Sequence, residues 1–187
     1  GEMNDIHKII VFYNNHMKPY QFGIIGAGMY GKVLMKWLQQ DERAHILWVN
    51  SASEATTKAA AQEFGVEKWS TDYYEVLNDP QVDAVVIATP PFLHAEQIEA
   101  SLKAGKHVLL EKPIAESRES LQRIVKAVES APSLKVLEAS CRHTRLTQKF
   151  KFIKEIIGSG KLGDVYHIHH NSLGRTTFIE YNPNGTW

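Results

Sequence analysis

The sequence predicts an α/β fold in which helices cover both faces of a doubly wound parallel sheet. Short apolar runs alternate with amphipathic stretches, and a glycine-rich loop separates the first apolar run from the first such stretch. The apolar runs are nearly continuous, which is typical of strands buried on both faces by crossover helices. Because 43% of the residues are hydrophobic, the chain can fill the core of such a fold.

The pattern of apolar residues places the individual elements. We expect strands at 20–25, 45–49, near Trp69, and at 83–88, 107–110 and 134–139. The spacing of a helix face predicts helices at 29–40, 54–64, 72–77, 92–104 and 117–130. Gly65 stands where a left-handed residue ends a helix, and Ser117 stands where a side chain caps one.

The alternation stops near residue 142, which divides the chain into three parts. Residues 1–18 lack the pattern and are interpreted as an extension or an engineered remnant. Residues 19–142 form the sheet domain. Residues 143–187 begin an α+β domain with a helix at 150–157 and a strand at 164–170. Because a lone strand cannot bury its faces, we expect this second domain to be truncated.

Charge and cysteine content exclude several classes of partner. The chain has 21 basic and 21 acidic residues, whereas nucleic-acid binding normally requires a basic excess. No run reaches the roughly 18 apolar residues that span a bilayer, and the first residues of the sequence lack the pattern of a signal peptide. Cys141 is the only cysteine, so an internal disulfide is excluded. We expect a cytoplasmic protein that binds neither nucleic acid nor membrane.

A glycine-rich loop follows the first predicted strand and reads Gly26-Ala27-Gly28-Met29-Tyr30-Gly31. This pattern between a strand and a helix is typical of the Rossmann fold, which binds dinucleotides. Gly26 permits a tight turn, Gly28 lets the backbone approach a pyrophosphate, and Gly31 lets the helix pack on the strand. Met29 and Tyr30 open the helix, whose free N–H groups would face the phosphates. A turn that binds no ligand is the alternative.

The end of the second strand bears on which nicotinamide cofactor fits. NAD-binding Rossmann proteins place an acid there, about 20 residues after the glycines, to hold the ribose 2′-hydroxyl. Here the chain reads Val49-Asn50-Ser51-Ala52-Ser53, and the first acid is Glu54. Ser51 can donate to a 2′-phosphate and Asn50 can reach the ribose, so NADP is favoured. NAD stays open because no arginine lies beside them.

Two more loops follow strands, at the edge where parallel sheets bind ligands. In Thr89-Pro90-Pro91-Phe92-Leu93-His94, the prolines either line a ligand or simply end a strand and begin a helix. His94 is interpreted as structural or as a cofactor-edge contact, not as a catalytic base. In Glu111-Lys112-Pro113, the lysine can bond a substrate oxygen and Glu111 can orient it. A solvent-exposed ion pair is the alternative.

These three motifs, in this order and spacing, resemble the Gfo/Idh/MocA family of oxidoreductases over residues 20 to about 175. The resemblance implies an enzyme that uses NADP or NAD to oxidise or reduce a small molecule, namely a sugar, cyclitol or related polyol. It implies pyrophosphate contacts at the three glycines and the following roles for other residues. Thr89, Pro90 and His94 would lie along the cofactor, Glu111 would place its nicotinamide end, and Lys112 would bind substrate and assist proton transfer.

The resemblance also has implications for the second domain. Arg145 falls where the family often has an arginine near the domain junction, which makes it a second substrate-binding candidate, although the usual following proline is absent. The family's second domain is largely an antiparallel sheet, mediates homo-oligomers and supplies an Asp-x-x-x-His segment, which is expected beyond Trp187. We therefore expect this chain to be an inactive fragment when alone. The alternative is a non-catalytic nucleotide-sensing or regulatory module, and Lys112 favours the enzyme.

Three histidines near the end of the chain suggest a metal site, but their spacing argues against one. On a strand, His167 and His169 would share one face while His170 would point to the other. Zinc usually requires three or four ligands, and two fall short of that number. We therefore expect no bound metal.

Overall fold

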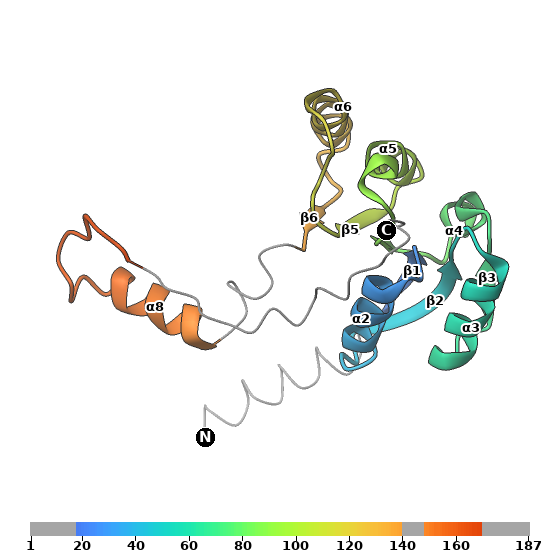
Figure 1. The fold of residues 1–187 in the computed structure, drawn as a ribbon, viewed down its shortest axis with the longest axis horizontal. Coiled ribbons are helices and arrows are strands. Elements are labelled where there is room, and N and C mark those ends of the chain that lie inside the picture. The colour runs from blue at the N-terminus through green and yellow to red at the C-terminus, as the bar shows by residue number, and fades with distance from the viewer. Residues whose placement is uncertain (1–17, 140–147, 170–187) are drawn as a thin grey trace, which may run out of the picture. The chain divides into compact units, whose positions relative to one another are not determined.

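The computed structural model describes residues 18–139 and 148–169. Its centre is a six-stranded sheet with the order β3-β2-β1-β4-β5-β6, in which every neighbouring pair is parallel (Figure 1). The strands are β1 (Tyr20–Ile25), β2 (Ala44–Asn50), β3 (Lys68–Ser70), β4 (Ala84–Ile87), β5 (His107–Leu110) and β6 (Val136–Glu138). The strand order reverses between β1 and β4, which confirms the predicted doubly wound sheet.

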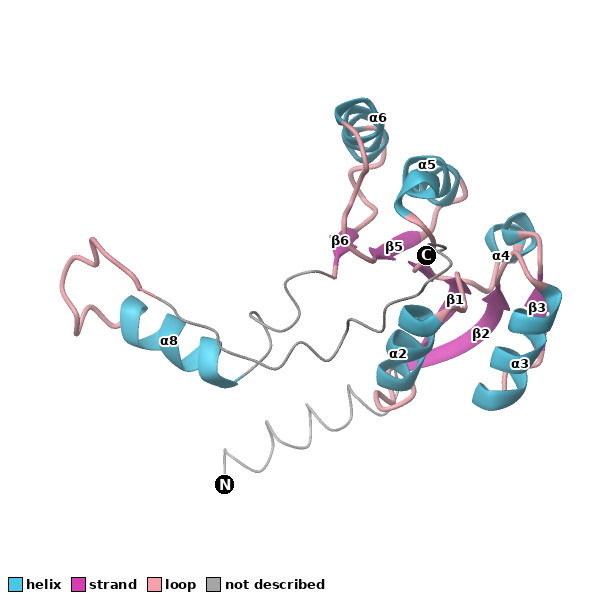
Figure 2. Cartoon of the chain, viewed as in Figure 1, coloured by secondary structure: helices cyan, strands magenta, loops and turns pink. Residues whose placement is uncertain are grey.

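Helices connect the strands and cover both faces of the sheet (Figure 2). They are α2 (Met29–Leu38), α3 (Glu54–Phe64), α4 (Tyr73–Asn78), α5 (His94–Lys103) and α6 (Arg118–Glu129). Alternate residues of β1 face opposite layers: Ile24 belongs to the core formed with α2 and α3, and Ile25 to the core formed with α4, α5 and α6. Both side chains are fully buried, which explains why the strand sequence is apolar throughout.

One predicted helix has a different start. The pattern predicts a helix from residue 92, whereas the structure has a short 3₁₀ helix η1 (Pro91–Leu93) and then α5 from His94. Pro90 is extended, with φ −58° and ψ 143°, and Pro91 cannot donate a backbone hydrogen bond. The two prolines therefore delay the regular helix by one tight turn.

Contacts divide the chain into the units Gly1–Arg142 and His143–Trp187. In the second unit, α8 (Gln148–Gly158) contains the helix predicted at 150–157. The strand predicted from Asp164 to His170 is wrong for the residues that the structure describes, because 164–169 form no strand. A strand needs a hydrogen-bonded neighbour, and α8 is the only regular element described in this unit.

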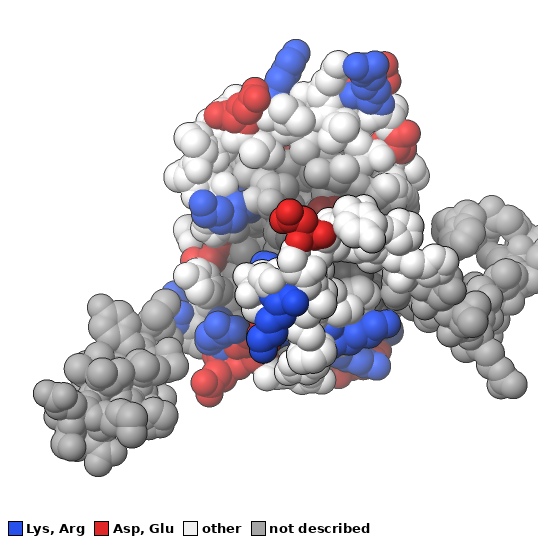
Figure 3. Space-filling view, turned by 90° about the vertical axis from the view of Figure 1, so that its left-hand side faces the viewer, with Lys and Arg blue, Asp and Glu red and all other residues white. Residues whose placement is uncertain are grey.

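The surface of the described residues carries both signs of charge, as the face in Figure 3 shows. Several opposite charges pair across elements, such as Lys32 with Glu63 at 2.7 Å and Arg123 with Glu99 at 2.5 Å. Such exposed pairs contribute little to stability. No helix within the described ranges is long and apolar enough to cross a membrane.

Candidate functional site

Three loops with predicted site residues leave the sheet at the carboxyl ends of its parallel strands. The backbone hydrogen bonds of the sheet continue into these loops. Gly26 N–H donates to Asn50 O at 2.9 Å, Ala88 N–H to Ile25 O at 2.8 Å, and Glu111 N–H to Ile87 O at 2.9 Å. The glycine loop therefore lies between the end of β2 and the loop after β4, and the loop after β5 comes next.

Two of the three motif glycines are required by packing within the chain. Gly26 has φ +99°, and a Cβ there would lie 2.7 Å from the carbonyl carbon of Ala88. A Cβ on Gly31 would overlap the carbonyl oxygen of Gly26. These two residues let α2 pack close to β1 and to the loop after β4, and larger residues would push these segments apart.

Gly28 is different, because no contact among the described residues requires a glycine there. Its φ of −73° is open to any residue, and no atom of the described residues, apart from Gly28 and its chain neighbours, lies within 4 Å of the position that a Cβ would occupy. The open space lies beside the start of α2. A group from outside the chain that approaches the Gly28 backbone would account for the missing side chain.

The start of α2 lacks the side-chain cap that α3, α4 and α6 have, as does the start of α5. Side chains of Ser53, Asp72 and Ser117 cap α3, α4 and α6 by accepting hydrogen bonds from backbone N–H groups. Helix α2 begins at Gly28 without a side-chain cap and has no acidic residue in its first turn. Its N-terminal N–H groups and positive dipole end thus favour an anion such as a phosphate.

At the end of β2, the residues predicted to contact the ribose and the phosphate also make hydrogen bonds within the chain. Asn50 is only 4% exposed, and its side-chain nitrogen donates to Ser70 O at 2.9 Å. Ser51 uses its backbone carbonyl to accept from the hydroxyl of Thr57 at 3.1 Å. The nearby acid Glu54 pairs with Lys58 at 2.7 Å, and the hydrogen bond from Lys58 lowers the pKa of Glu54.

The loop after β4 is held by side chains of α5. The hydroxyl of Thr89 donates to Gln97 Oε1 at 2.5 Å, and Gln97 is itself buried. Pro90 continues the loop in an extended conformation. His94, expected to lie along the cofactor or to be structural, has a fully buried ring with its two nitrogens against backbone carbonyls.

The loop after β5 brings Lys112 to the glycine loop. The Lys112 ammonium lies 5.2 Å from the ring centroid of Tyr30, a contact that links two motifs separated by most of the domain. The carboxylate of Glu111 is buried and accepts from the backbone N–H of Lys112 at 3.1 Å. Glu111 thereby fixes the main chain from which the lysine extends.

Some contacts of the site could not be found from the sequence. Gln97 gave no signal, since it is a polar residue on a helix face one turn after His94. The bond from Asn50 to Ser70 and the contact of Tyr30 with Lys112 depend on which strands are neighbours. Two candidates, Arg145 and Met29, remain to be placed: Met29 opens α2 and is exposed, whereas Arg145 lies outside the described residues.

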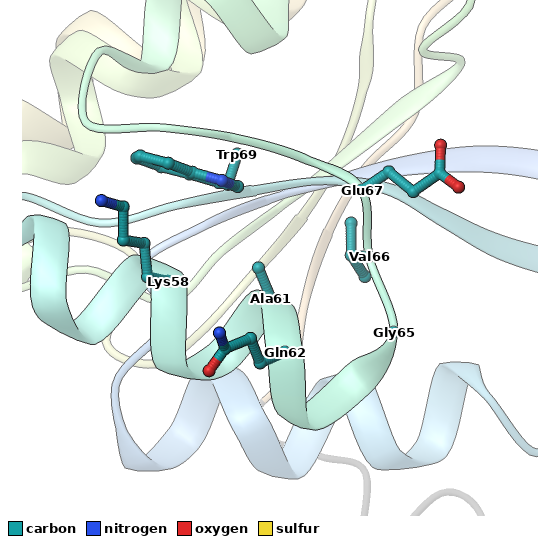
Figure 4. Close-up of a pocket in the computed structure, with 7 residues that line it drawn as sticks. All are labelled: Lys58, Ala61, Gln62, Gly65, Val66, Glu67 and Trp69. Carbon is teal, nitrogen blue, oxygen red and sulfur yellow. The ribbon is translucent and has the colours of Figure 1, made fainter.

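A cavity of about 580 Å³ lies elsewhere, between α3 and the edge strand β3 (Figure 4). Its lining residues are Lys58, Ala61, Gln62, Gly65, Val66, Glu67 and Trp69. The Lys58 ammonium lies 4.9 Å from the Trp69 ring centroid, and the cavity extends toward the loop that precedes β3. It is therefore separate from the loops at the carboxyl ends of β1, β4 and β5.

No group of three or more potential metal ligands gathers within residues 18–139 or 148–169. His167 and His169 are exposed, and His170 lies outside the described residues.

Comparison with known proteins agrees with this geometry. Residues 20–137 match the family model described as the oxidoreductase family with an NAD-binding Rossmann fold. An inositol 2-dehydrogenase from Rhizobium meliloti is 34% identical over 145 residues, which cover 78% of this chain and 42% of that protein. A myo-inositol 2-dehydrogenase from Thermotoga maritima is 29% identical over 143 residues, covering 76% of this chain and 42% of that protein.

Among solved structures, scyllo-inositol dehydrogenase from Lactobacillus casei, with bound NAD(H) and scyllo-inositol, matches with a TM-score of 0.72 and 30% identity. The match covers 79% of this chain and 43% of that one. The chain thus spans less than half the length of these relatives. The family match covers most of the sheet domain, including all three predicted motifs. The chain belongs to the Gfo/Idh/MocA oxidoreductase family and contains its NAD-binding Rossmann domain.

Proposed function

We propose that this chain is the cofactor-binding half of a dehydrogenase or reductase that transfers a hydride between a nicotinamide cofactor and a polyol or its carbonyl form. The observation that carries the proposal is the open space beside Gly28, next to a helix start that has no cap. A pyrophosphate fits both features, because it needs close backbone approach and unpaired N–H groups. The substrate class follows the inositol dehydrogenases among the relatives.

The residues of the three loops would divide the work as follows. The backbone of Gly28 and the first turn of α2 would hold the pyrophosphate, while Thr89 and Pro90 would lie along the cofactor. The bound nicotinamide supplies or accepts the hydride. Lys112 would bond the reacting oxygen of the substrate and move a proton there, since an ammonium can serve as general acid. Glu111 would keep the backbone of Lys112 in place.

For the cofactor itself we propose a preference for NADP over NAD. Residues 49–53 contain no carboxylate that would repel a 2′-phosphate, and the nearby Glu54 is already paired with Lys58. Ser51 stands at the end of β2, where a hydroxyl can donate to that phosphate. A carboxylate that holds the ribose 2′-hydroxyl, the usual mark of NAD binding, is absent from this stretch.

Titration of the chain with NADPH and with NADH, followed by nicotinamide fluorescence, tests the proposal. We expect both to bind and NADPH to bind more tightly. Tighter binding of NADH would overturn the cofactor preference, and binding of neither would overturn the proposed function.

A Lys112→Ala variant serves as the control in the same titration. Its cofactor affinity should match that of the unchanged chain, because Lys112 is assigned to the substrate. In the full-length protein, the same variant should lose turnover with inositol-type polyols. Unchanged turnover would contradict the role of Lys112.

A further inference from the structure

His94 has surroundings that its proposed place beside the cofactor does not explain. It is the first residue of α5, and its side chain is 0% exposed. A ring so buried cannot reach a substrate, so a direct catalytic role is excluded. The side chain must therefore act through the groups that it contacts.

The ring of His94 connects two loops of the site. Its Nδ1 lies 2.9 Å from the carbonyl oxygen of Pro113, and its Nε2 lies 2.9 Å from that of Thr89. Thr89 follows β4, and Pro113 directly follows Lys112 in the loop after β5. A single side chain thus spans the gap between the segment expected along the cofactor and the segment that carries the lysine.

The chemistry of these contacts constrains the ring. A carbonyl oxygen only accepts hydrogen bonds, so each of the two contacts needs an N–H on the ring nitrogen that faces it.

A second side chain of α5 holds the same loop. Gln97, one turn further along the helix, accepts the hydroxyl hydrogen bond of Thr89 at 2.5 Å. The backbone and the side chain of Thr89 are therefore both tied to α5. Of these two side chains, His94 also contacts the loop after β5, through the carbonyl oxygen of Pro113.

We propose that His94 is a positioning residue that fixes the distance between the Thr89–Pro90 segment and the Glu111–Lys112 segment, in which Glu111 is expected beside the nicotinamide end of the same cofactor, a role that rests on the proposed function. Without the ring, each loop keeps its own anchors, Gln97 for one and Glu111 for the other. Beyond the paired strands β4 and β5, the spacing of the two loops then loses the link through the ring. Small displacements of this kind are costly in sites where two segments must contact one ligand.

The test compares His94→Leu and His94→Gln with Ile98→Ala. Leucine removes both donors, and glutamine keeps one amide that can reach one carbonyl. Ile98 is equally buried on the same helix but has no hydrogen-bonding group, so its variant controls for lost stability. Unfolding temperatures are measured first, and NADPH affinity is then measured where all variants are folded.

We expect His94→Leu to raise the Kd about tenfold, equivalent to ~1.4 kcal/mol, and His94→Gln to have a smaller effect. Ile98→Ala should keep the Kd within about twofold despite its lower unfolding temperature. A Kd for His94→Leu equal to that of the unchanged chain, or an equal loss in Ile98→Ala, would overturn the proposal. Failure of the unchanged chain to bind any nicotinamide cofactor would instead refute the proposed function.

A measurement on the unchanged chain covers the case in which His94→Leu does not fold. Nitrogen-15 NMR of the ring should show two N–H groups that exchange slowly with solvent, one for each carbonyl. A ring with a single N–H would mean that only one loop is bonded, and the proposal would be wrong.

Discussion

Two edges of the sheet use their polar groups differently. At the amino ends of β3, β4 and β5, the carboxylate of Asp79 accepts hydrogen bonds from Trp48 and Lys68. At the carboxyl end of β1, helix α2 starts after Gly28 with no side-chain cap. The first region pairs polar groups with one another inside the chain. The second leaves donors available and a space open beside them. We therefore expect the residues of the first region to stabilise the fold and those of the second region to bind a ligand.

The amino-end cluster consists of Asp79, Trp48, Lys68 and Lys106. Lys106 is 6% exposed and donates to the carbonyl oxygens of Asp79 and Val82 at 2.9 and 2.8 Å. Burial lowers the pKa of Lys106, and the charges of Asp79 and Asp83 partly oppose that effect. Since these groups find partners within the chain, we expect substitutions there to change stability and leave ligand binding intact.

The largest loss of stability should come from Gly31→Ala. Its new methyl group would overlap the carbonyl oxygen of Gly26, a backbone atom that cannot move without shifting the loop. We expect the free energy of unfolding to fall by about 3 kcal/mol. Urea denaturation measures the loss, and a variant as stable as the unchanged chain would show that α2 does not pack this closely.

Asp79→Ala should have the next largest effect. It removes the acceptor of the Trp48 indole N–H at 2.7 Å and of the Lys68 ammonium at 2.8 Å. Because Lys68 is partly exposed, most of the loss should come from the unpaired indole, and we expect about 2 kcal/mol. Cofactor affinity should be unchanged, and a parallel loss of affinity would break the division between the two regions.

The amino-end cluster also predicts that the stability of the fold depends on pH. Burial raises the pKa of Asp79, but the hydrogen bonds from Lys68 and Trp48 prevail and lower it from 3.8 to about 2. A carboxyl group with a depressed pKa stabilises the fold above its unfolded pKa, and that contribution is lost as the pH falls. The stability difference between the unchanged chain and Asp79→Ala should therefore shrink between pH 3.8 and about 2. A constant difference would contradict the charge state assigned to Asp79.

Local rules predicted much of the fold from the sequence. Gly65 has φ +65° at the end of α3, and Ser117 caps α6, as expected from residue type and position alone. The glycine loop was found by the same kind of rule. The strand expected from residue 164 was wrong because strand formation depends on a neighbour, which an alternating pattern does not supply.

The candidate site was only partly predictable for a related reason. Its loops follow from the order of strands, but the contacts between loops follow from which strands are adjacent. The contacts of His94 with Thr89 and Pro113 join segments after β4 and β5, and nothing in the hexapeptide that ends at His94 indicates the second partner. Likewise, the hydrogen bond from the side chain of Asn50 to the carbonyl oxygen of Ser70 forms because β3 lies beside β2.

The central claim is that a pyrophosphate approaches the backbone of Gly28, and Gly28→Ala tests it most directly. We expect this substitution to change stability little and cofactor binding strongly. Among the described residues, the methyl group would meet no atom within 4 Å beyond its chain neighbours, so the free energy of unfolding should fall by less than about 1 kcal/mol. The same methyl group would occupy the space assigned to the pyrophosphate, so the Kd for NADPH should rise at least about tenfold, or ~1.4 kcal/mol. Affinity equal to that of the unchanged chain would contradict the account.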